Sequence, residues 1–406
     1  MRLIVNQLST LRRKTGIGYY THELLRHFRQ LYPEWHITAY PEGWHRRLRE
    51  YVNAPAARPP ASASTHDASV PAPMRSLLRQ KVKGRLRRGI QEITAALFRR
   101  ACRRKRCELY LEPNFIPLAY DIPVVVSLHD LSALLYPQWH PPERIDYYER
   151  HFAQVLKNGR HFLTLTHYVR RELIEQLQVA PERVTAIYLG TRADMNRLDR
   201  GYVAHTLKRL GLPNDYLLYL GTIEPRKNIH MLLQAYVSLP VALRERCPLV
   251  LVGEWGWNAE EVAVFLHDEA RHHHVIYLGY VEENLLPVLY NGARALVYPS
   301  HYEGFGLPPL EMLACGGAVL CSDAGALVEV FGRHAHIIPT ADRDGWRQAM
   351  FNAISDEDWI TGLRRDGASY ARSFTWERCA RQTARVLESV LHPSQPTTII
   401  PAGSSN

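Results

Sequence analysis

Short apolar runs alternate with longer amphipathic segments along most of this chain. Each run is rich in β-branched or aromatic residues, which is typical of a strand buried on both faces of a parallel sheet. Such a sheet needs helices on both faces, so the alternation predicts βαβ units and an α/β fold. The runs form two sets: RLIVN, HITAY, ELYLE, VVVSLHD, FLTLT and VTAIYLG, then YLLYLGT, PLVLVGE, VIYLGY, ALVYPS, AVLCSD and AHIIPT.

The two sets of strands predict two Rossmann-like domains. A chain of 406 residues is too long for one ordinary core, and the polar stretch 191–215 separates the two sets. We therefore expect an N-terminal domain at 1–200 and a C-terminal domain at 213–373. A helical pattern at 374–391 is expected to pack back on the N-terminal domain. The Pro-, Ser- and Thr-rich tail at 392–406 is expected to be disordered.

Residues 45–106 interrupt this rhythm as an insertion. Residues 54–73 have the composition of a flexible loop, and 75–106 contain thirteen Lys or Arg with one acid, Glu92. An apolar stripe at helical spacing runs opposite these charges. We therefore expect residues 74–106 to form a helix that lies in an anionic membrane interface. The alternative is a solvated insertion whose stripe packs on the first domain. The stripe consists of Met74, Leu78, Val82, Leu86, Ile90, Ile93 and Leu97.

The net charge and the hydropathy of the chain indicate which kinds of partner and which cell compartment to expect. The net charge of +10 and the pI near 9.3 favour an anionic partner. No apolar run approaches the length of a membrane-spanning helix, and the amino terminus reads as a strand and not as a secretory leader. We therefore expect a cytoplasmic protein, with peripheral attachment to the inner face of a membrane through the basic insertion.

The stretch EGFGLPPLE carries two carboxylates, Glu303 and Glu311, directly after the predicted strand ALVYPS. Ligands of parallel α/β sheets bind beyond the carboxyl ends of strands, and the following helix start favours phosphate. Carboxylates would repel a phosphate unless hydroxyl groups of the same ligand donate hydrogen bonds to them. The segment therefore predicts a nucleotide-sugar site, and we expect Glu311 in the first turn of the helix. The predicted contacts are Glu303, Gly304, Phe305, Gly306, Leu307 and Glu311.

A second loop, GTIEPRKN, supplies positive charge after the strand YLLYLGT. Arg226 and Lys227 precede a helical run, where they are placed to neutralise a leaving nucleoside diphosphate. Because these two cations and helix amino termini can hold the diphosphate, and no D-x-D pair ends a strand, we expect no metal ion and no other cofactor.

These motifs together resemble family 4 of the glycosyltransferases, retaining enzymes with the two-domain GT-B fold. The resemblance rests on E-x7-E at 303–311, E-P-R-K-N at 224–228, T-G-I-G-Y-Y at 15–20 and the pair His129 and Asp130. It implies two Rossmann-like domains whose parallel sheets face each other across a central cleft, an acceptor domain at 1–200 and a nucleotide-sugar-binding domain at 213–373. It also implies transfer of a hexose, with mannose from GDP-mannose favoured, to a glycan or lipid-linked acceptor in cell-surface polysaccharide synthesis.

The resemblance also implies roles for individual residues. Catalytic roles fall to Glu303, which contacts the donor sugar, and to His129 and Asp130 beside the reacting sugar. One departure is Thr222, where many members carry an arginine. The nucleotide-sugar contacts implied elsewhere are Gly16 and Gly18 near the diphosphate, Arg226 and Lys227 on the diphosphate, Glu311 on the ribose, and Val281 and Leu286 near the base.

Two other classes of protein share some of these features. A glycosidase, or an enzyme that processes sugar nucleotides, would use carboxylates in a similar cleft, but a glycosidase leaves the Arg226–Lys227 pair and the glycines unexplained. A nucleic-acid-binding protein would explain the basic insertion, but no interleaved aromatic residues accompany it, so we expect no nucleic acid partner.

Overall fold

The computed structural model describes residues 1–11, 16–42 and 92–392, and within these ranges every predicted strand run contains a strand. The predicted tail beyond His392 and most of the basic insertion lie outside the described residues. The strands are β1 (Arg2–Asn6), β2 (His36–Tyr40), β3 (Leu109–Glu112), β4 (Val124–Leu128), β5 (His161–Thr164), β6 (Val184–Ala186), β7 (Tyr216–Leu220), β8 (Leu249–Val252), β9 (Val275–Gly279), β10 (Ala293–Tyr298), β11 (Ala318–Ser322) and β12 (His336–Ile338).

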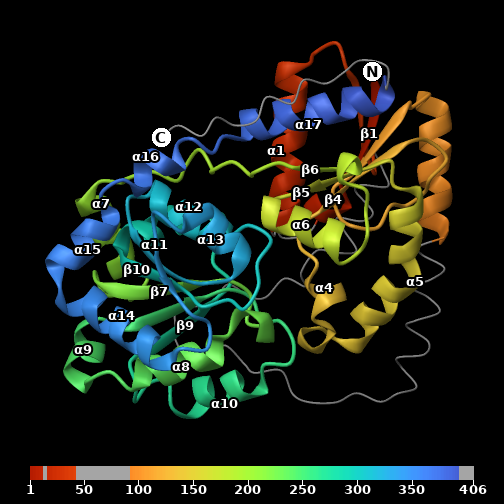
Figure 1. Cartoon of the computed structure of the whole chain (residues 1–406). Helices are drawn as coiled ribbons and strands as arrows, with labels where there is room; N and C mark the ends of the chain where they lie inside the picture. The colour runs from red at the N-terminus through yellow and green to blue at the C-terminus, as the bar shows by residue number, and fades with distance from the viewer. Residues whose placement is uncertain (12–15, 43–91, 393–406) are drawn as a thin grey trace.

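In the described part of the chain, these strands form two parallel six-stranded sheets, one in each lobe of the molecule (Figure 1). The first has the order β2-β1-β3-β4-β5-β6 and the second β12-β11-β10-β7-β8-β9. Every residue of β4, β8 and β11 is buried, which explains their unbroken apolar sequences. The predicted α/β class with two Rossmann-like sheets is confirmed, whereas the limits 1–200 and 213–373 stay predictions.

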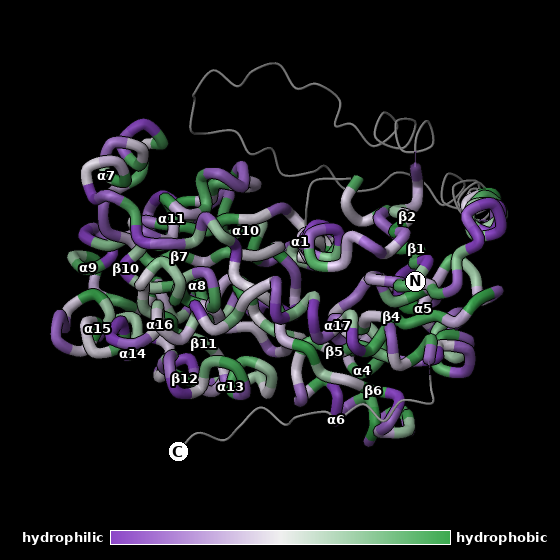
Figure 2. Tube along the Cα trace, turned by 90° about the horizontal axis from the view of Figure 1, so that it is seen from above, coloured by the Kyte–Doolittle hydropathy of each residue, from purple (hydrophilic) through white to green (hydrophobic). Residues whose placement is uncertain are grey.

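Helices cover both sheets. From above, the two lobes lie side by side, with α7 and α15 toward one end and α5 toward the other (Figure 2). The helices are α1 (Gly16–Leu31), α4 (Ser132–Leu135), α5 (Pro142–Asn158), α6 (His167–Glu175), α7 (Arg200–Arg209), α8 (Ile229–Val237), α9 (Val241–Arg246), α10 (Glu260–Asp268), α11 (Leu286–Gly292), α12 (Leu307–Ala314), α13 (Gly325–Phe331), α14 (Arg343–Ser355), α15 (Glu357–Arg364), α16 (Gly367–Ala371) and α17 (Trp376–Leu391).

The chain returns to the first lobe through α17, which packs across α1 (Figure 1). Its buried residues recur at three- and four-residue spacing, so one apolar face of the helix packs on the first lobe. Trp376 at its start contacts the rings of Tyr19 and Tyr20, with centroids 5.6 and 6.2 Å apart. The second crossing between the lobes therefore ends against the first turns of α1.

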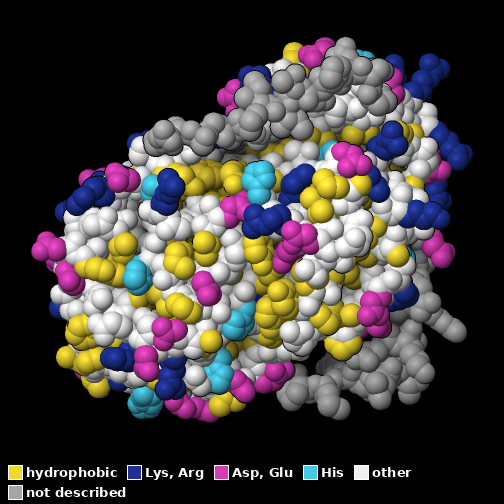
Figure 3. All heavy atoms as spheres, viewed as in Figure 1, with side chains coloured by type: hydrophobic (Ala, Val, Ile, Leu, Met, Phe, Trp, Pro, Cys, Tyr) yellow, Lys and Arg dark blue, Asp and Glu magenta, His cyan; other side chains and the backbone are white. Residues whose placement is uncertain are grey.

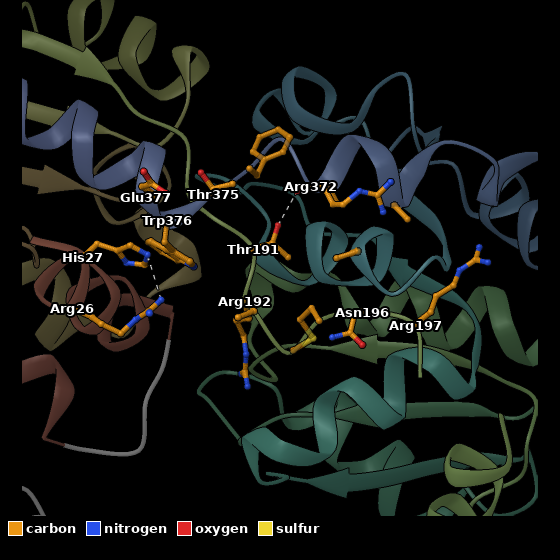
Figure 4. A pocket seen from close by; sticks show the side chains of 16 residues that line it. Arg26, His27, Thr191, Arg192, Asn196, Arg197, Arg372, Thr375, Trp376 and Glu377 are labelled. Atoms are coloured by element: carbon orange, nitrogen blue, oxygen red, sulfur yellow. Dashed lines mark hydrogen bonds between the residues drawn. The ribbon is translucent and has the colours of Figure 1, made fainter. Parts of the chain in front are cut away.

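The two chain crossings touch each other and form a hinge. The amide of Thr191 donates to the carbonyl of Phe374 at 2.9 Å, and a Cβ on Gly190 would lie 2.2 Å from the amide nitrogen of Trp376. A cavity of about 700 Å³ opens at this hinge. Figure 4 shows Arg26 of α1 and Trp376 on one side of the cavity. Arg197, in the linker between β6 and α7, lies on the other side. The hinge cavity is thus lined by both lobes.

The described end of the basic insertion is a helix over residues 92–105 that packs on the first lobe. Thr94, Phe98 and Cys102 form its buried face, and the ring of Phe98 lies 4.6 Å from that of Tyr110. Ile93, by contrast, is 61% exposed, so at this position the stripe does not pack on the first lobe, and its contact with a membrane stays a prediction. The predicted stripe passes through Ile93 and Leu97, whereas the face that packs on the core is one residue further along the chain and passes through Thr94, Phe98 and Cys102. Stripe positions 74–90 lie outside the described residues.

Candidate active site

Glu303 lies directly between two cations at the carboxyl end of β10. Its Oε1 accepts a hydrogen bond from Nζ of Lys227 at 2.5 Å, and its Oε2 accepts one from Nη1 of Arg226 at 3.0 Å. Burial alone would raise the pKa of Glu303, but the ammonium of Lys227 and the guanidinium of Arg226 lower it to about 2. The carboxylate is therefore ionised throughout the neutral range.

The 3₁₀ helix η4 (Pro225–Lys227) fixes both cations. Arg226 donates to Oε1 of Glu224 at 2.7 Å and to the carbonyl of Tyr302 at 2.7 Å, while Lys227 donates to the hydroxyl of Tyr298 at 2.9 Å. Burial lowers the pKa of Lys227, and the charge of Glu303 partly offsets this. A guanidinium has five N–H donors and an ammonium has three. Within the described part of the chain, four donors of Arg226 and two of Lys227 have partners, so each side chain keeps one N–H that can bind a ligand.

His129 and Asp130 follow β4 and meet this cluster from the first lobe. The buried His129 ring donates from Nε2 to the carbonyl of Pro113 at 2.6 Å, and burial lowers its pKa, so the ring is neutral at pH 7. Asp130 accepts from the amide and hydroxyl of Ser132 at 2.9 and 2.7 Å. Burial acts to raise the pKa of Asp130, but Arg226 and Ser132 bring it below its usual value. The structure thus brings the predicted catalytic residues together.

Gly304 lets the two lobes approach each other. A Cβ at this position would lie 1.6 Å from the carbonyl oxygen of His129, so no larger residue fits without moving a lobe. Across the same junction, the hydroxyl of Thr166 donates to the carbonyl of Gly304 at 3.2 Å. Gly306 has φ of 102° as the residue before α12, a conformation that favours glycine. The loop from Gly304 to Leu307, with Phe305 buried within it, is shaped by these contacts.

Gly16 and Gly18 have different surroundings. A Cβ on Gly16 would lie 3.8 Å from Cδ1 of Leu307, so the described start of α1 faces the start of α12 across the junction. A Cβ on Gly18 would lie 2.6 Å from the carbonyl of Ser9 within the first lobe. Gly18 is therefore explained by packing beneath η1 (Leu8–Thr10), and only Gly16 lies against the second lobe.

Glu311 lies on α12, one turn beyond the glycine loop. The helix begins at Leu307, so Glu311 is its fifth residue and the prediction that it lies in the first turn was wrong. Its Oε2 accepts from the hydroxyl of Tyr290 at 2.8 Å. Burial raises the pKa of Glu311 to about 7, although Arg192 and Tyr290 act to lower it. This carboxyl titrates near neutrality, unlike Glu303.

Arg192 is a buried linker residue that the sequence patterns did not single out. Its Nη2 donates to Asp194 at 2.8 Å and to the carbonyl of Glu283 at 3.2 Å, and its guanidinium lies 5.2 Å from the centre of the Tyr19 ring. It also acts electrostatically on Glu311. Only its position, in the segment between β6 and α7 that joins the two lobes, could have indicated a role at the junction.

The loop after β9 lies beside this linker. Val281 and Leu286 flank the 3₁₀ helix η5 (Glu283–Leu285), and both are partly buried against the hydrophobic cluster that contains Val288. Since Arg192 contacts Glu283, the loop, the linker and Glu311 belong to one neighbourhood. Glu303, Arg226 and Lys227 form the other half of the candidate site, next to the glycine loop.

Comparison with known proteins identifies the family. Residues 14–194 match the family model described as Glycosyltransferase Family 4, and residues 208–374 match Glycosyl transferases group 1. The chain is 35% identical over 277 residues to O-antigen chain mannosyltransferase B of Escherichia coli, covering 68% of this chain and 72% of that protein. The chain belongs to glycosyltransferase family 4. Serotype-specific mannosyltransferase WbdA of Escherichia coli is 30% identical over 281 residues, which is 67% of this chain and 34% of WbdA.

Solved structures confirm the GT-B fold of this family 4 glycosyltransferase. Anabaena HepE in complex with UDP and glucose superposes with a TM-score of 0.70 at 16% identity, covering 96% of this chain and all of that one. WaaG, a glycosyltransferase involved in lipopolysaccharide biosynthesis, gives 0.66 at 13% identity, with coverage of 95% and 99%. At these identities the likeness concerns the fold alone.

The described residues contain neither a membrane-spanning helix nor a cluster of metal ligands. None of the helices there combines the length and the apolar composition needed to cross a bilayer. In the same ranges no three His, Cys, Asp or Glu side chains are grouped as a metal site would require.

Proposed function

We propose that this glycosyltransferase is a retaining hexosyltransferase that moves mannose from GDP-mannose to a glycan or lipid-linked acceptor in cell-surface polysaccharide synthesis. The observation that carries the proposal is the ionised Glu303, held by Lys227 and Arg226 opposite His129 and Asp130. The family and the names of the mannosyltransferase relatives support the choice of mannose.

The donor diphosphate is assigned to the space between the starts of α1 and α12. Helix amino termini favour phosphate, and the remaining N–H groups of Arg226 and Lys227 add charge-assisted hydrogen bonds. Gly16 is exposed at the start of α1, so its backbone amide is accessible there. Glu303, Glu224 and Asp130 already surround Arg226 and Lys227 and hold the two cations in place. The cations therefore orient the diphosphate as well as attract it.

Specific contacts with the two ends of the donor follow. Glu303 accepts hydrogen bonds from hydroxyls of the donor sugar, and Glu311 accepts them from the ribose. Val281 and Leu286 flank the base. Arg192, which the sequence patterns missed, positions Glu311 and the loop at Glu283, because it contacts or polarises both.

Transfer with retention proceeds by attack on the face of the sugar from which the diphosphate leaves. The bond between the anomeric carbon and the phosphate oxygen breaks, the acceptor oxygen bonds to the same face, and its proton passes to the departing phosphate. His129 is neutral, so it holds a donor hydroxyl beside the developing positive charge without adding to it. Glu303 and Asp130 are both ionised and stabilise that charge electrostatically.

A donor panel tests the proposal. Purified full-length protein is titrated with GDP-, UDP- and TDP-linked sugars, and nucleotide release is followed with a mannose-terminated oligosaccharide as acceptor. GDP-mannose should bind and release GDP, whereas preference for a UDP- or TDP-sugar would contradict the donor assignment. Release of free sugar from a glycan without any nucleotide would indicate a glycosidase.

The anionic membrane surface remains a proposal for residues 74–106, and so does the cytoplasmic location. On the described helix over 92–105, the residues that face away from the core include Arg99, Arg100, Arg103 and Arg104, which are exposed. Each basic residue near an anionic surface contributes about 1 kcal/mol of attraction. A lipid-linked acceptor would be reached from such a surface.

A further inference from the structure

A second hollow opens on the first lobe beside the candidate active site, between the end of α4 and α6. Its volume is about 410 Å³. Figure 3 shows hydrophobic side chains, tyrosines included, gathered along the junction of the two lobes in the view of Figure 1. The lining of this α4–α6 hollow includes Tyr136, Tyr168, Arg171, Glu172, Glu175 and Gln176.

Tyr302 connects Glu172 of this hollow to the Glu303 cluster. Its hydroxyl donates to Oε2 of Glu172 at 2.5 Å and accepts from the amide of Leu131 at 3.2 Å. Its carbonyl accepts from Arg226 at 2.7 Å. Glu303 is the next residue along the chain, and Leu131 directly follows Asp130. A ligand in the hollow therefore lies one side chain away from the proposed position of the donor sugar.

Aromatic rings give the hollow surfaces that suit the apolar faces of sugar rings. The ring of Tyr136 stacks on Trp139, with centroids 4.4 Å apart and planes 24° apart, and lies 5.4 Å from Tyr302. Tyr168 is held by Gly325 of α13, where a Cβ would lie 1.9 Å from the ring, and by Arg171 at 5.8 Å. Rings fixed in this way lose little conformational entropy when a ligand packs against them.

The polar groups of the hollow disfavour an anionic ligand. Two carboxylates, Glu172 and Glu175, face one guanidinium, Arg171, so the lining is formally negative by one charge. Such a lining disfavours phosphates and carboxylates, but its oxygens accept from hydroxyl groups, and Gln176 can donate or accept. Burial raises the pKa of Glu172, despite the opposing hydrogen bonds from Tyr302 and Tyr168. The chemistry is that of a neutral polyol site.

We propose that the α4–α6 hollow is a subsite for the neutral glycan chain of the acceptor, with Tyr136 packed against a sugar ring and Glu172 and Gln176 bonded to its hydroxyls. The inference rests on the proposed function and adds where the acceptor lies. A chain seated here would present a neighbouring hydroxyl past Tyr302 toward the donor sugar beside Glu303.

Steady-state kinetics with GDP-mannose and a mannose oligosaccharide test this subsite. Tyr136→Ala and Glu172→Gln should each raise the KM for the oligosaccharide about tenfold, the loss expected for one good contact, and should raise it far more than the KM for GDP-mannose. Tyr202→Ala is the matched control, because Tyr202 is 56% exposed on α7 and belongs to neither site. It should leave both KM values unchanged.

A binding measurement separates the possible failures. Saturation-transfer NMR with the oligosaccharide and GDP should show binding to the parent and to Tyr136→Phe, which keeps the ring, and loss of binding in Tyr136→Ala. Equal binding by the parent and Tyr136→Ala would overturn the subsite. If oligosaccharide binding depends on Tyr136 but no nucleotide sugar is turned over, the subsite stands and the proposed function fails.

Discussion

Lys227 and Glu303 form a buried ion pair at 2.5 Å, although one follows β7 and the other β10, 76 positions apart in the chain. β7 and β10 are neighbours in the second sheet, so their carboxyl ends meet at one edge. Arg226 closes the other side of the same carboxylate at 3.0 Å. A charge fixed in this way changes neither protonation nor position at neutral pH, which is what electrostatic stabilisation of a transition state requires.

Glu303→Gln should reduce kcat by about a hundredfold or more, because the uncharged amide stabilises developing positive charge poorly. The affinity for GDP should hardly change, since the proposed partner of Glu303 is the sugar. Turnover assays combined with calorimetric titration of GDP measure both. Near-normal turnover in a folded variant would remove Glu303 from the mechanism.

Lys227→Ala and Arg226→Ala should each weaken GDP binding. A hydrogen bond to a charged group is worth about 1.5 to 3 kcal/mol, which is about tenfold to a hundredfold in the dissociation constant. Lys208→Ala serves as control, because Lys208 is exposed on α7. If all three variants bind GDP as tightly as the parent, neither cation contacts the diphosphate.

Glu311 should make stability depend on pH. Its pKa is raised from an ordinary value of 4.5 to about 7, so between these values the unfolded chain loses a proton that the folded chain keeps. Stability therefore falls as pH rises from 4.5 to 7, by about 3 kcal/mol for a shift of this size. Glu311→Gln removes that loss while its amide oxygen still accepts from Tyr290.

Urea unfolding of the parent and Glu311→Gln at several pH values measures the difference. The variant should gain relative to the parent as pH rises from 4.5 to 7, and the gap should level off above that. A gap that stays constant over this range would show that Glu311 is not buried as a titrating acid.

Gly304→Ala should impair catalysis by forcing the lobes apart. The added Cβ would lie 1.6 Å from the carbonyl oxygen of His129, a backbone atom that cannot rotate away. Gly362→Ala on α15 is the matched control, since no atom lies within 4 Å of its added Cβ. Small-angle scattering and kcat should change in the first variant only. Full activity of Gly304→Ala would mean that this closed contact is not used in catalysis.

Replacing Arg100, Arg103, Arg104 and Arg106 with Gln should weaken binding to phosphatidylglycerol vesicles. These residues are exposed, whereas Phe98 and Cys102 on the same segment are buried, so the substitutions spare the packed face. Added salt should release the parent, because exposed charges are screened beyond about 8 Å at physiological ionic strength. A parent protein that never floats with such vesicles would refute the membrane proposal.

The sequence predicted both sheets because strand runs follow from unbroken apolar residues. It also placed Arg226, Lys227 and Glu303 at the carboxyl ends of strands, which meet at one edge of a parallel sheet. It did not predict that both cations pair with the carboxylate of Glu303. Arg192 could not be found this way. It contacts the Tyr19 ring of α1 and the carbonyl of Glu283, and its charge acts on Glu311 of α12, and only the arrangement of the two lobes brings these groups together. The exposure of Ile93 likewise depended on which register packs against Tyr110.

The most direct test of retaining transfer at this site is proton NMR of the reaction between GDP-α-mannose and a mannose-terminated oligosaccharide, run with the parent and with Glu303→Gln. We expect the parent to release one GDP for each new glycosidic bond, and the anomeric signal of the first product to be that of an α-linked mannose. Glu303→Gln should show neither signal at comparable enzyme concentration. A β-linked first product, or α-linked product formed equally well by Glu303→Gln, would contradict the account.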